Sequence, residues 1–427
     1  MHIYFAGIGG TGIGPLAIIA KQAGYDVSGS DKQDSSYIQS VRKVGIEEIS
    51  LDQSGRYLES LHVKHPIDWV VYSSALVKEN PNHPELEMAK KQGIRISKRD
   101  EFINFLLKDK GLKLIAIAGT HGKTTTTAMM IWVLKQLSIP VSYSVGAKLS
   151  FGEMGEYDSK SQYFVYEADE YDRNFMNFKP EISIISGIAY DHPDVYPTIN
   201  DYTQAFADFV GQSLQVIAHP DDLEKIGYKS DTELINPRSF NLIGEVNRKN
   251  AQLVTEATLE IAKDLKLNIS NENIIGILNE FPGLSRRFEK IANHIYSDYA
   301  HTPEKILGAL QIAREVAGDN VVVVYEGLHN TRQHFIKDRL VDLFKGVKKL
   351  YVVPSYRARE DESLDDLTPE KLCQIICFPD ERVPSRLDMN LKEEITNNAT
   401  TENLVLCLSA GGGGSLDEWL RQNFFMG

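Results

Sequence analysis

The sequence predicts an α/β protein made of three domains in series, each built around a parallel sheet. Short β-branched runs alternate with helical patterns along the chain, which is typical of strands joined by crossover helices. The length of 427 residues also fits about three domains, since a domain usually holds ~100–200 residues. We therefore expect domains at 1–109, 110–292 and 293–427.

The first domain is expected to begin with a strand, a glycine turn and a helix. The run HIYFAG predicts a strand at 2–7, and apolar spacing predicts a helix at 13–23. The polar run KDKG at 108–111 marks the end of this domain. Between them we expect strands at 25–30, 68–74 and 93–97 and a helix at 100–107.

The other two domains continue this alternation. The run LKLIAIAG at 112–119 is apolar throughout, as in a strand buried on both faces. The helix expected at 124–137 is apolar on most sides and hence buried. Later strands are expected at 163–169, 181–187, 214–219, 294–298, 320–326, 348–353 and 402–410, with helices at 251–262, 303–316 and 416–423.

The composition excludes several classes of protein. Apolar residues make up 42% and charged residues 25%, which rules out a disordered or fibrous chain. The net charge of −13 argues against nucleic-acid binding, and no apolar run reaches the ~18–20 residues of a membrane span. The first residues also lack a basic signal region, so we expect a cytoplasmic protein without membrane partners. Cys373, Cys377 and Cys407 are expected to be buried thiols.

A glycine motif follows the first expected strand. Gly7, Gly9 and Gly12 satisfy GxGxxG between a strand and a helix, where backbone N–H groups and the helix N-terminus bind a diphosphate. Asp31 ends the second expected strand, which is the place of a ribose-binding acid. The motif fits any nucleotide diphosphate, NAD included. A glycine turn needed only for helix–strand packing is the alternative.

A second glycine motif, Gly119-Thr120-His121-Gly122-Lys123-Thr124, has the form of the end of a P-loop. In such a loop, backbone N–H groups hold phosphates, the lysine contacts terminal phosphate oxygens and a hydroxyl reaches Mg²⁺. The pattern GxxxxGK[ST] would need glycine at Ile117, so this loop is shorter than the standard one. A packing turn alone does not explain the Lys-Thr-Thr-Thr-Thr run at its mouth.

Two acidic segments follow later strands of the same domain. The segment EADEYD at 167–172 carries four carboxylates, and Mg²⁺ is the natural counter-ion for such a cluster beside a phosphate loop. Glu167 ends a strand, where α/β sheets bind ligands, whereas a solvated loop is the alternative for the later acids taken singly. Asp191-His192 is either a functional pair or a surface turn, since Mg²⁺ prefers oxygen ligands.

Three further pairs of polar residues are candidates for ligand contacts: Asn247 and Asn250, Arg286 and Arg287, and Asp298 and His301. The asparagines stand at an expected helix start, where asparagine is most often a cap. The arginines suit phosphate or carboxylate recognition, with a salt-bridged surface turn as the alternative. The last pair precedes Thr302 and Pro303, which are explained as the N-cap and first residue of a helix. Capping does not explain the pair itself.

In this order, the motifs resemble the Mur ligase family, the ATP-dependent amide-forming enzymes of bacterial peptidoglycan synthesis. The pair GTHGKTTTT and EADEYD is highly specific, whereas the glycine fingerprint alone is not. The resemblance covers nearly the whole chain and is greatest for the branch that uses L-alanine. It rests on FAGIGGTGIGPLA, SGSD, GTHGKTTTT, EADEYDRNF, YDHPD, RRFE and DYAHTPE.

The resemblance implies an enzyme that joins an amino acid, L-alanine above all, to the carboxylate of UDP-N-acetylmuramic acid. ATP would form an acyl phosphate with Mg²⁺ as the metal ion, and ADP and phosphate would be released. A Rossmann-like first domain would bind the UDP-sugar, a P-loop-type central domain ATP, and a Rossmann-like third domain the amino acid. The enzyme would be a monomer or a weak homodimer.

The resemblance also implies roles for individual residues. The UDP-sugar would contact Gly7, Gly9, Gly10, Thr11, Gly12, Ser30, Asp31, Ser73 and Ser74, with His301 near the amino acid. ATP would contact Gly119, Thr120, His121, Gly122, Lys123, Thr124, Thr125, Asn247, Asn250 and Arg287. Catalysis would involve Lys123, Glu167, His192, Arg287 and Asp298, and the metal ion Thr124, Glu167 and His192.

The sequence departs from the family pattern at three places. Val246 replaces the histidine of GxHNxxN, Ser186-Gly187 replaces Thr-Asn, and the arginine-bearing segment at 328–332 matches weakly. The main alternative is the recycling branch of the family, which attaches a tripeptide to UDP-N-acetylmuramic acid. An NAD-dependent oxidoreductase with an added ATPase domain and a nucleotide sensor without turnover are more distant alternatives.

Overall fold

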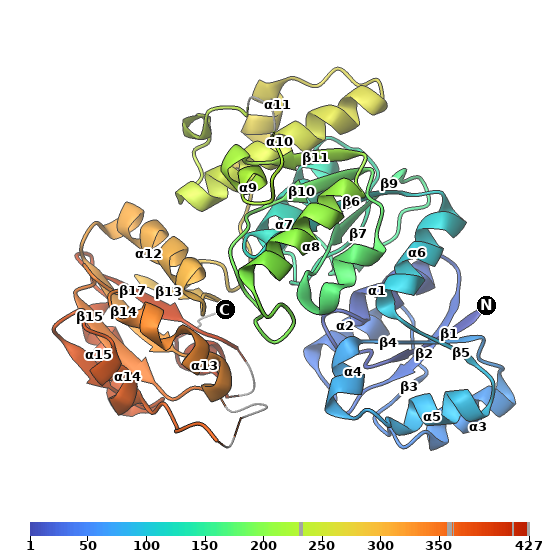
Figure 1. Ribbon diagram of the computed structural model, residues 1–427, viewed down its shortest axis with the longest axis horizontal. Helices are drawn as coiled ribbons and strands as arrows, with labels where there is room; N and C mark the ends of the chain where they lie inside the picture. The colour runs from blue at the N-terminus through green and yellow to red at the C-terminus, as the bar shows by residue number, and fades with distance from the viewer. Residues whose placement is uncertain (230–233, 357–360, 362, 412–413, 425–427) are drawn as a thin grey trace. The chain divides into compact units, whose positions relative to one another are not determined.

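The fold is α/β, as predicted, with three sheets that are parallel except for one antiparallel edge pair in each of the last two. Figure 1 labels most of the elements. Contacts divide the chain into two units, residues 1–240 with 250–281, and residues 241–249 with 282–427. The computed structural model describes residues 1–229, 234–356, 361, 363–411 and 414–424.

The first sheet belongs to the first unit and has the strand order β3-β2-β1-β4-β5. The chain leaves the carboxyl end of the central strand β1 between β2 and β4, which is where open α/β sheets usually bind ligands. The strands are β1 (His2–Ala6), β2 (Asp26–Ser30), β3 (Ile49–Ser50), β4 (Trp69–Tyr72) and β5 (Arg95–Lys98). The helices are α1 (Gly14–Gln22), α2 (Ser36–Lys43), α3 (Arg56–Lys64), α4 (Ser74–Glu79), α5 (Pro84–Lys91) and α6 (Arg99–Lys110).

The second sheet, also in the first unit, has the order β11-β10-β6-β9-β7-β8. Its central strand β6 is apolar and almost fully buried, so it lies between layers of helices as the sequence predicted. The strands are β6 (Lys113–Ala118), β7 (Ser142–Ser144), β8 (Gly155–Glu156), β9 (Tyr163–Glu167), β10 (Ile182–Ile185) and β11 (Gln215–Ala218). The helices are α7 (Lys123–Gln136), η1 (Tyr171–Asn177), α8 (Ile199–Gly211), α9 (Pro220–Glu224), η2 (Pro237–Ser239), α10 (Glu245–Asp264) and α11 (Asn271–Asn279).

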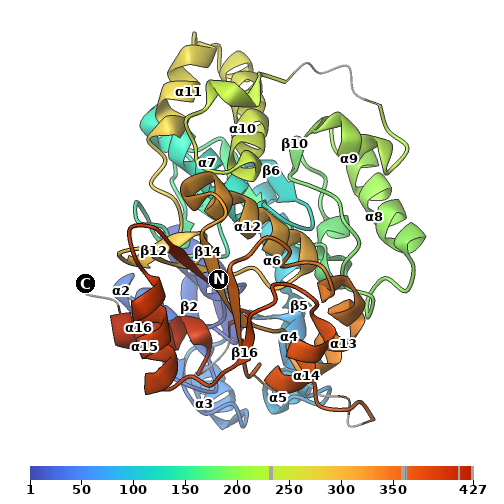
Figure 2. The ribbon, with the colours of Figure 1, turned by 90° about the vertical axis from the view of Figure 1, so that its left-hand side faces the viewer.

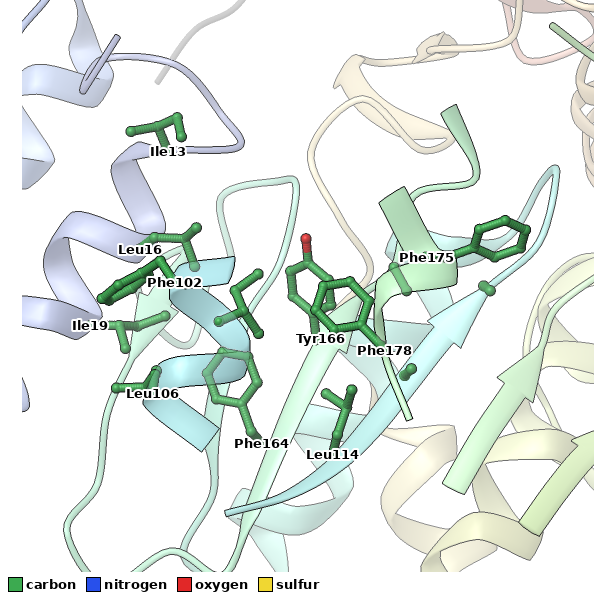
Figure 3. Packing of buried hydrophobic residues seen from close by; sticks show 14 of the residues in the cluster. Ile13, Leu16, Ile19, Phe102, Leu106, Leu114, Phe164, Tyr166, Phe175 and Phe178 are labelled. Atoms are coloured by element: carbon green, nitrogen blue, oxygen red, sulfur yellow. The ribbon is translucent and has the colours of Figure 1, made fainter. Parts of the chain in front are cut away.

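One continuous apolar cluster joins the two sheets of the first unit. It includes Leu16 and Ile19 of α1, Phe102 of α6, and Phe164 and Tyr166 of β9 (Figure 3). Each fully buried side chain of this size contributes roughly 1.5–3 kcal/mol to folding. The loop that follows β1 and the loops that follow β6 and β9 are therefore held on one packed body.

The third sheet belongs to the second unit and has the order β12-β13-β17-β14-β15-β16. Figure 2 shows α15 and α16 on one face of it, with α12 and α14 on the other, and each face buries its own apolar cluster. The strands are β12 (Glu289–Ala292), β13 (Ile295–Asp298), β14 (Val321–Glu326), β15 (Lys349–Val353), β16 (Arg382–Pro384) and β17 (Leu404–Leu408). The helices are α12 (Pro303–Ala317), α13 (Asn330–Ile336), η3 (Lys337–Leu340), α14 (Pro369–Ile375), α15 (Met389–Asn398) and α16 (Leu416–Phe424).

Three local expectations need correction. Helix α10 begins at Glu245, before the expected start at 251, so Asn247 and Asn250 lie inside its first turns and do not cap it. Thr302 stands at the N-cap of α12, but its side chain makes no capping hydrogen bond. Among the cysteines only Cys407 is buried, while Cys377 is exposed and Cys373 half-buried. Within the described residues, no helix has the length and apolar character needed to span a membrane.

Candidate active site

The phosphate loop connects the end of β6 to the start of α7. Gly119 and Gly122 have φ values of +142° and +80°, a region that side chains other than glycine rarely adopt. A Cβ atom on Gly119 would lie 2.5 Å from the Ser186 hydroxyl oxygen. Because α7 begins at Lys123, the N–H groups of its first turn have no acceptor within the helix and face the loop, which favours an anion there.

Lys123 contacts both the phosphate loop and a buried acid. Its Nζ donates to the Gly119 carbonyl and to Glu170 Oε2, each at 2.6 Å. The Glu170 side chain is only 1% exposed and the Lys123 side chain 15%. Burial alone would raise the pKa of Glu170, but the Lys123 ammonium and the His192 ring outweigh burial and lower it. The buried pair is therefore ionised, with its charges compensated internally.

His192 lies on the other side of Glu170. Its Nε2 is 3.5 Å from Glu170 Oε1 and 3.8 Å from Asp191 Oδ2. The His192 backbone has φ +57° and its N–H donates to Asp191 Oδ1 at 2.8 Å, so the turn fixes the ring. Glu170 thus joins Lys123 and His192, two of the predicted catalytic residues. Within EADEYD, Glu170 is buried while the other three acids are half-buried, a difference that the sequence alone does not indicate.

Thr124 and Glu167 lie together at the carboxyl end of β9. Thr124 Oγ1 donates to Glu167 Oε1 at 2.9 Å, and the Gly146 N–H donates to Glu167 Oε2 at 2.9 Å. A hydroxyl and a carboxylate are the oxygen ligands that Mg²⁺ prefers, so this donor set fits the expected ion. The third predicted ligand, His192, contacts Glu170 and Asp191.

The Ser186-Gly187 departure lies against the phosphate loop. Ser186 Oγ donates to the carbonyl of His121 at 2.5 Å. Gly187 has φ +153°, and a Cβ atom there would lie 2.5 Å from His121 Nε2. Buried Asn250 reaches the loop from α10, since a Cβ atom on Gly122 would be 3.0 Å from its Oδ1. Ser186 and Gly187 therefore pack against the backbone and the His121 side chain of the phosphate loop.

The glycine loop of the first sheet is set against the end of β2. The N–H groups of Gly7 and Ile8 donate to the Ser30 carbonyl at 2.8 and 2.9 Å. The Gly9 N–H donates to Asp31 Oδ2 at 2.8 Å. One of the N–H groups expected to bind a phosphate is therefore already hydrogen-bonded to a carboxylate. Ser73 and Ser74 lie at the N-terminus of α4.

Below this loop, Ser30 is part of a buried polar cluster that the sequence did not predict. Ser30 Oγ donates to Glu85 Oε2 at 2.7 Å, and the Tyr4 hydroxyl donates to Glu85 Oε1 at 2.5 Å. Burial raises the pKa of Glu85 to about 7, although both hydroxyl bonds favour the charged form. The cluster positions the end of β2 and hence the wall of the glycine loop.

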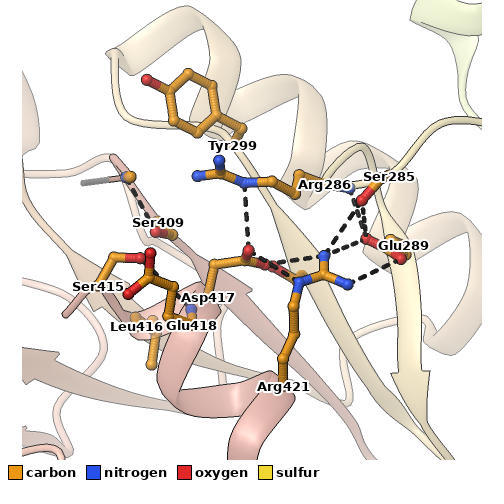
Figure 4. A network of polar contacts seen from close by, with 12 residues as sticks. Ser285, Arg286, Glu289, Tyr299, Ser409, Ser415, Leu416, Asp417, Glu418 and Arg421 are labelled. Carbon is orange, nitrogen blue, oxygen red and sulfur yellow. Dashed lines mark hydrogen bonds and ion pairs between the residues drawn. The ribbon is translucent and has the colours of Figure 1, made fainter. Parts of the chain in front are cut away.

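In the second unit, Arg286 belongs to a network of ion pairs (Figure 4). Arg286 lies 3.3 Å from Asp417 and stacks on Tyr299, with 4.7 Å from guanidinium to ring centre. Arg421 binds Asp417 and Glu289 in the same network. For Arg286, the structural alternative of a salt-bridged turn therefore holds.

Asp298 and His301 are buried beside Arg287 in this unit. The Phe288 N–H donates to Asp298 Oδ2 at 2.7 Å. Burial raises the pKa of Asp298 to about 6, although Arg287 lowers it. The His301 ring packs against Tyr299 at 4.8 Å. Asn247 belongs to this unit as well, and all other predicted site residues belong to the first unit.

Comparisons with known proteins cover most of the chain. Residues 2–110 match the Mur ligase family, catalytic domain, and residues 117–229 match the Mur ligase middle domain. A UDP-N-acetylmuramate–L-alanine ligase of Clostridium acetobutylicum is 31% identical over 84% of this chain and 84% of its own. One of Syntrophomonas wolfei is 29% identical over 87% of this chain and 86% of its own.

Solved structures share the fold over nearly the full length. A UDP-N-acetylmuramate–alanine ligase of Thermotoga maritima has a TM-score of 0.72 at 24% identity and covers 99% of this chain and 98% of its own. A murein peptide ligase of Psychrobacter arcticus has a TM-score of 0.60 at 20% identity over the same shares. These likenesses concern the arrangement of the elements.

Proposed function

Because the chain belongs to the Mur ligase family of ATP-dependent ligases, which act in peptidoglycan synthesis, we propose that it joins L-alanine to UDP-N-acetylmuramic acid. The observation that carries this proposal is the joining of Lys123, Glu170 and His192 at the phosphate loop, beside the Thr124–Glu167 pair. Relatives named UDP-N-acetylmuramate–L-alanine ligase support the choice of substrates. The alternative of an NAD-dependent oxidoreductase is set aside, since the family is one of ligases.

The reaction begins with a carboxylate, which is a poor electrophile. Transfer of the terminal phosphoryl group of ATP to the carboxylate of UDP-N-acetylmuramic acid would give an acyl phosphate and ADP. Lys123 would hold the transferring group as its ammonium shifts from Glu170 toward phosphate oxygens. Thr124 and Glu167 would hold Mg²⁺, which neutralises charge on the phosphates.

The amine of L-alanine would then attack the acyl carbonyl, and phosphate would leave. The protein does little covalent work in either step, so positioning of the substrates dominates. Arg287 and Asp298 are proposed to act with the nucleotide, and His301 near the amino acid. A cytoplasmic location is part of this proposal.

Phosphate release tests the proposed ligase function. We expect release only when ATP, Mg²⁺, UDP-N-acetylmuramic acid and L-alanine are all present. Lys123→Ala should lower the rate by at least about 100-fold, because it removes the buried ammonium from the phosphate loop. Lys135→Ala is the matched control, since Lys135 lies in the last turn of the same helix and pairs with Glu156. Equal rates for Lys123→Ala and the wild type would refute the proposed site.

Magnesium dependence tests the proposed metal ligands. Glu167→Gln keeps the shape of the side chain but removes the negative charge beside Thr124. We expect the Mg²⁺ concentration at half-maximal rate to rise about tenfold or more, with partial recovery at high Mg²⁺. An unchanged Mg²⁺ dependence would show that the ion binds elsewhere.

A further inference from the structure

Arg99 links the glycine loop of the first sheet to the acidic loop that follows β9. Arg99 is the first residue of α6. A Cβ atom on Gly12 would lie 2.4 Å from Arg99 Nη1, so the guanidinium packs directly on the glycine loop. On its other edge, Arg99 Nη2 is 3.5 Å from Asp169 Oδ2. The Arg99 side chain is only 18% exposed, so its position is restricted.

Two other cations of the first domain hold the same acidic loop. Lys98 Nζ is 3.1 Å and Lys78 Nζ 3.8 Å from the Asp172 carboxylate. Lys78 Nζ also donates to the Tyr171 hydroxyl at 2.9 Å. These lysines bind the loop through Tyr171 and Asp172, whereas Arg99 binds it through Asp169 and also packs on Gly12.

Asp169 is placed to pass a displacement on to the phosphate loop. It adjoins Glu170, which holds Lys123 at 2.6 Å. Its carbonyl accepts from the Phe175 N–H, and its Oδ1 accepts from the Tyr171 N–H at 3.2 Å. A change in the position of Asp169 therefore changes the backbone that carries Glu170.

We propose that Arg99 is a positioning residue through which the UDP-sugar and the ATP sites are coupled. The inference rests on the proposed function for the identity of the two ligands. Arg99 Nη1 would donate to a diphosphate bound on the glycine loop while Nη2 stays paired with Asp169. A guanidinium can make both contacts because it presents donors on two edges. The anion would fix Arg99, Arg99 would fix Asp169, and Glu170 and Lys123 would be held in place for ATP.

Coupling of this kind is reciprocal, so each ligand tightens the other by the same factor. Calorimetry of the wild type would give the affinity for UDP-N-acetylmuramic acid without and with a non-hydrolysable ATP analogue and Mg²⁺. We expect a tightening of about fivefold or more. In Arg99→Lys and Asp169→Asn this factor should fall to about one, because a lysine lacks the second edge and an amide lacks the charge.

Arg95→Lys is the matched control. Arg95 lies on β5 close in sequence, stacks on Trp69 at 3.6 Å and pairs with Glu101, so the coupling factor should stay at its wild-type value. The double variant Arg99→Lys/Asp169→Asn should lose no more coupling than either single variant, because both changes break one link. Melting temperatures would check that each variant is folded.

The outcomes separate this inference from the proposed function. Wild-type coupling that survives in Arg99→Lys would overturn the role of Arg99. So would an affinity for the UDP-sugar that falls equally with and without the ATP analogue, since Arg99 would then be a simple ligand contact. Failure of the wild type to bind UDP-N-acetylmuramic acid would instead refute the proposed function, and this inference with it.

Discussion

Lys123 Nζ lies 2.6 Å from Glu170 Oε2, so the lysine expected to bind phosphate is already paired with a buried carboxylate. Glu170 holds His192 with its other oxygen, at 3.5 Å. An incoming phosphate would compete with Glu170 for the Lys123 ammonium. The ion pair with Glu170 therefore holds the Lys123 side chain in a fixed, desolvated position before the nucleotide binds.

Glu170→Gln should lower kcat by at least about tenfold, because Lys123 and His192 lose the charge that holds them. The affinity for ATP should change less than kcat, since the loss of a competing carboxylate offsets the loss of the group that positions Lys123. Steady-state kinetics and calorimetry with the ATP analogue check both parts. Asp194→Asn, an exposed change in the same region as His192, should behave as the wild type. An unchanged kcat in Glu170→Gln would contradict this account.

The buried Glu85 predicts a pH-dependent stability. Its pKa is raised from 4.5 to about 7 by burial, so between these values the folded state holds a proton that the unfolded state has released. Stability from this group is therefore greatest below about pH 4.5 and falls as the pH rises to about 7, by roughly 3 kcal/mol. Relative to the wild type, Glu85→Gln should gain stability between pH 5 and pH 8.

Denaturant unfolding of both proteins at pH 5 and pH 8 measures this difference. Glu87→Gln is the matched control, since Glu87 lies on the same helix and forms an exposed pair with Lys90. If the free energy of unfolding changes equally with pH in the wild type and in Glu85→Gln, Glu85 is ionised in the folded state at pH 5. The raised pKa assigned to Glu85 would then be wrong.

Replacement by alanine should lower the stability of the protein at one glycine and raise it at another. A Cβ atom on Gly155 would lie 2.5 Å from the Pro15 carbonyl oxygen, where α1 packs on β8. Gly155→Ala should therefore cost about 1–3 kcal/mol. Gly276 lies inside α11 with open space around its Cα, so Gly276→Ala should stabilise by about 0.5–1 kcal/mol. Thermal unfolding distinguishes the two, and equal shifts would refute the packing argument.

Continuous apolar runs made much of the fold predictable. The runs at 112–119 and 320–326 became the buried strands β6 and β14, because a strand covered on both faces has no polar side. The motif loops could also be located, since glycine, lysine and acids between a strand and a helix mark a ligand edge. Short strands such as β3 carry no such pattern and were missed.

Long-range contacts could not be predicted. Arg99 and Gly12 are far apart in the sequence, and only the packing of α6 beside the glycine loop brings them together. The burial of Glu170 depends likewise on how the loop after β9 folds over Lys123. The predicted start of α10 is too late because asparagine near a helix start usually caps the helix, whereas Asn250 lies inside α10 against the phosphate loop.

The identity of the amine is the central claim, and a competition assay tests it most directly. L-alanine, glycine, L-serine and the recycled tripeptide would be offered together with ATP, Mg²⁺ and UDP-N-acetylmuramic acid, and the product mass measured. We predict UDP-N-acetylmuramoyl-L-alanine as the main product. A product that carries only the tripeptide would contradict the choice of L-alanine and assign the enzyme to the recycling branch.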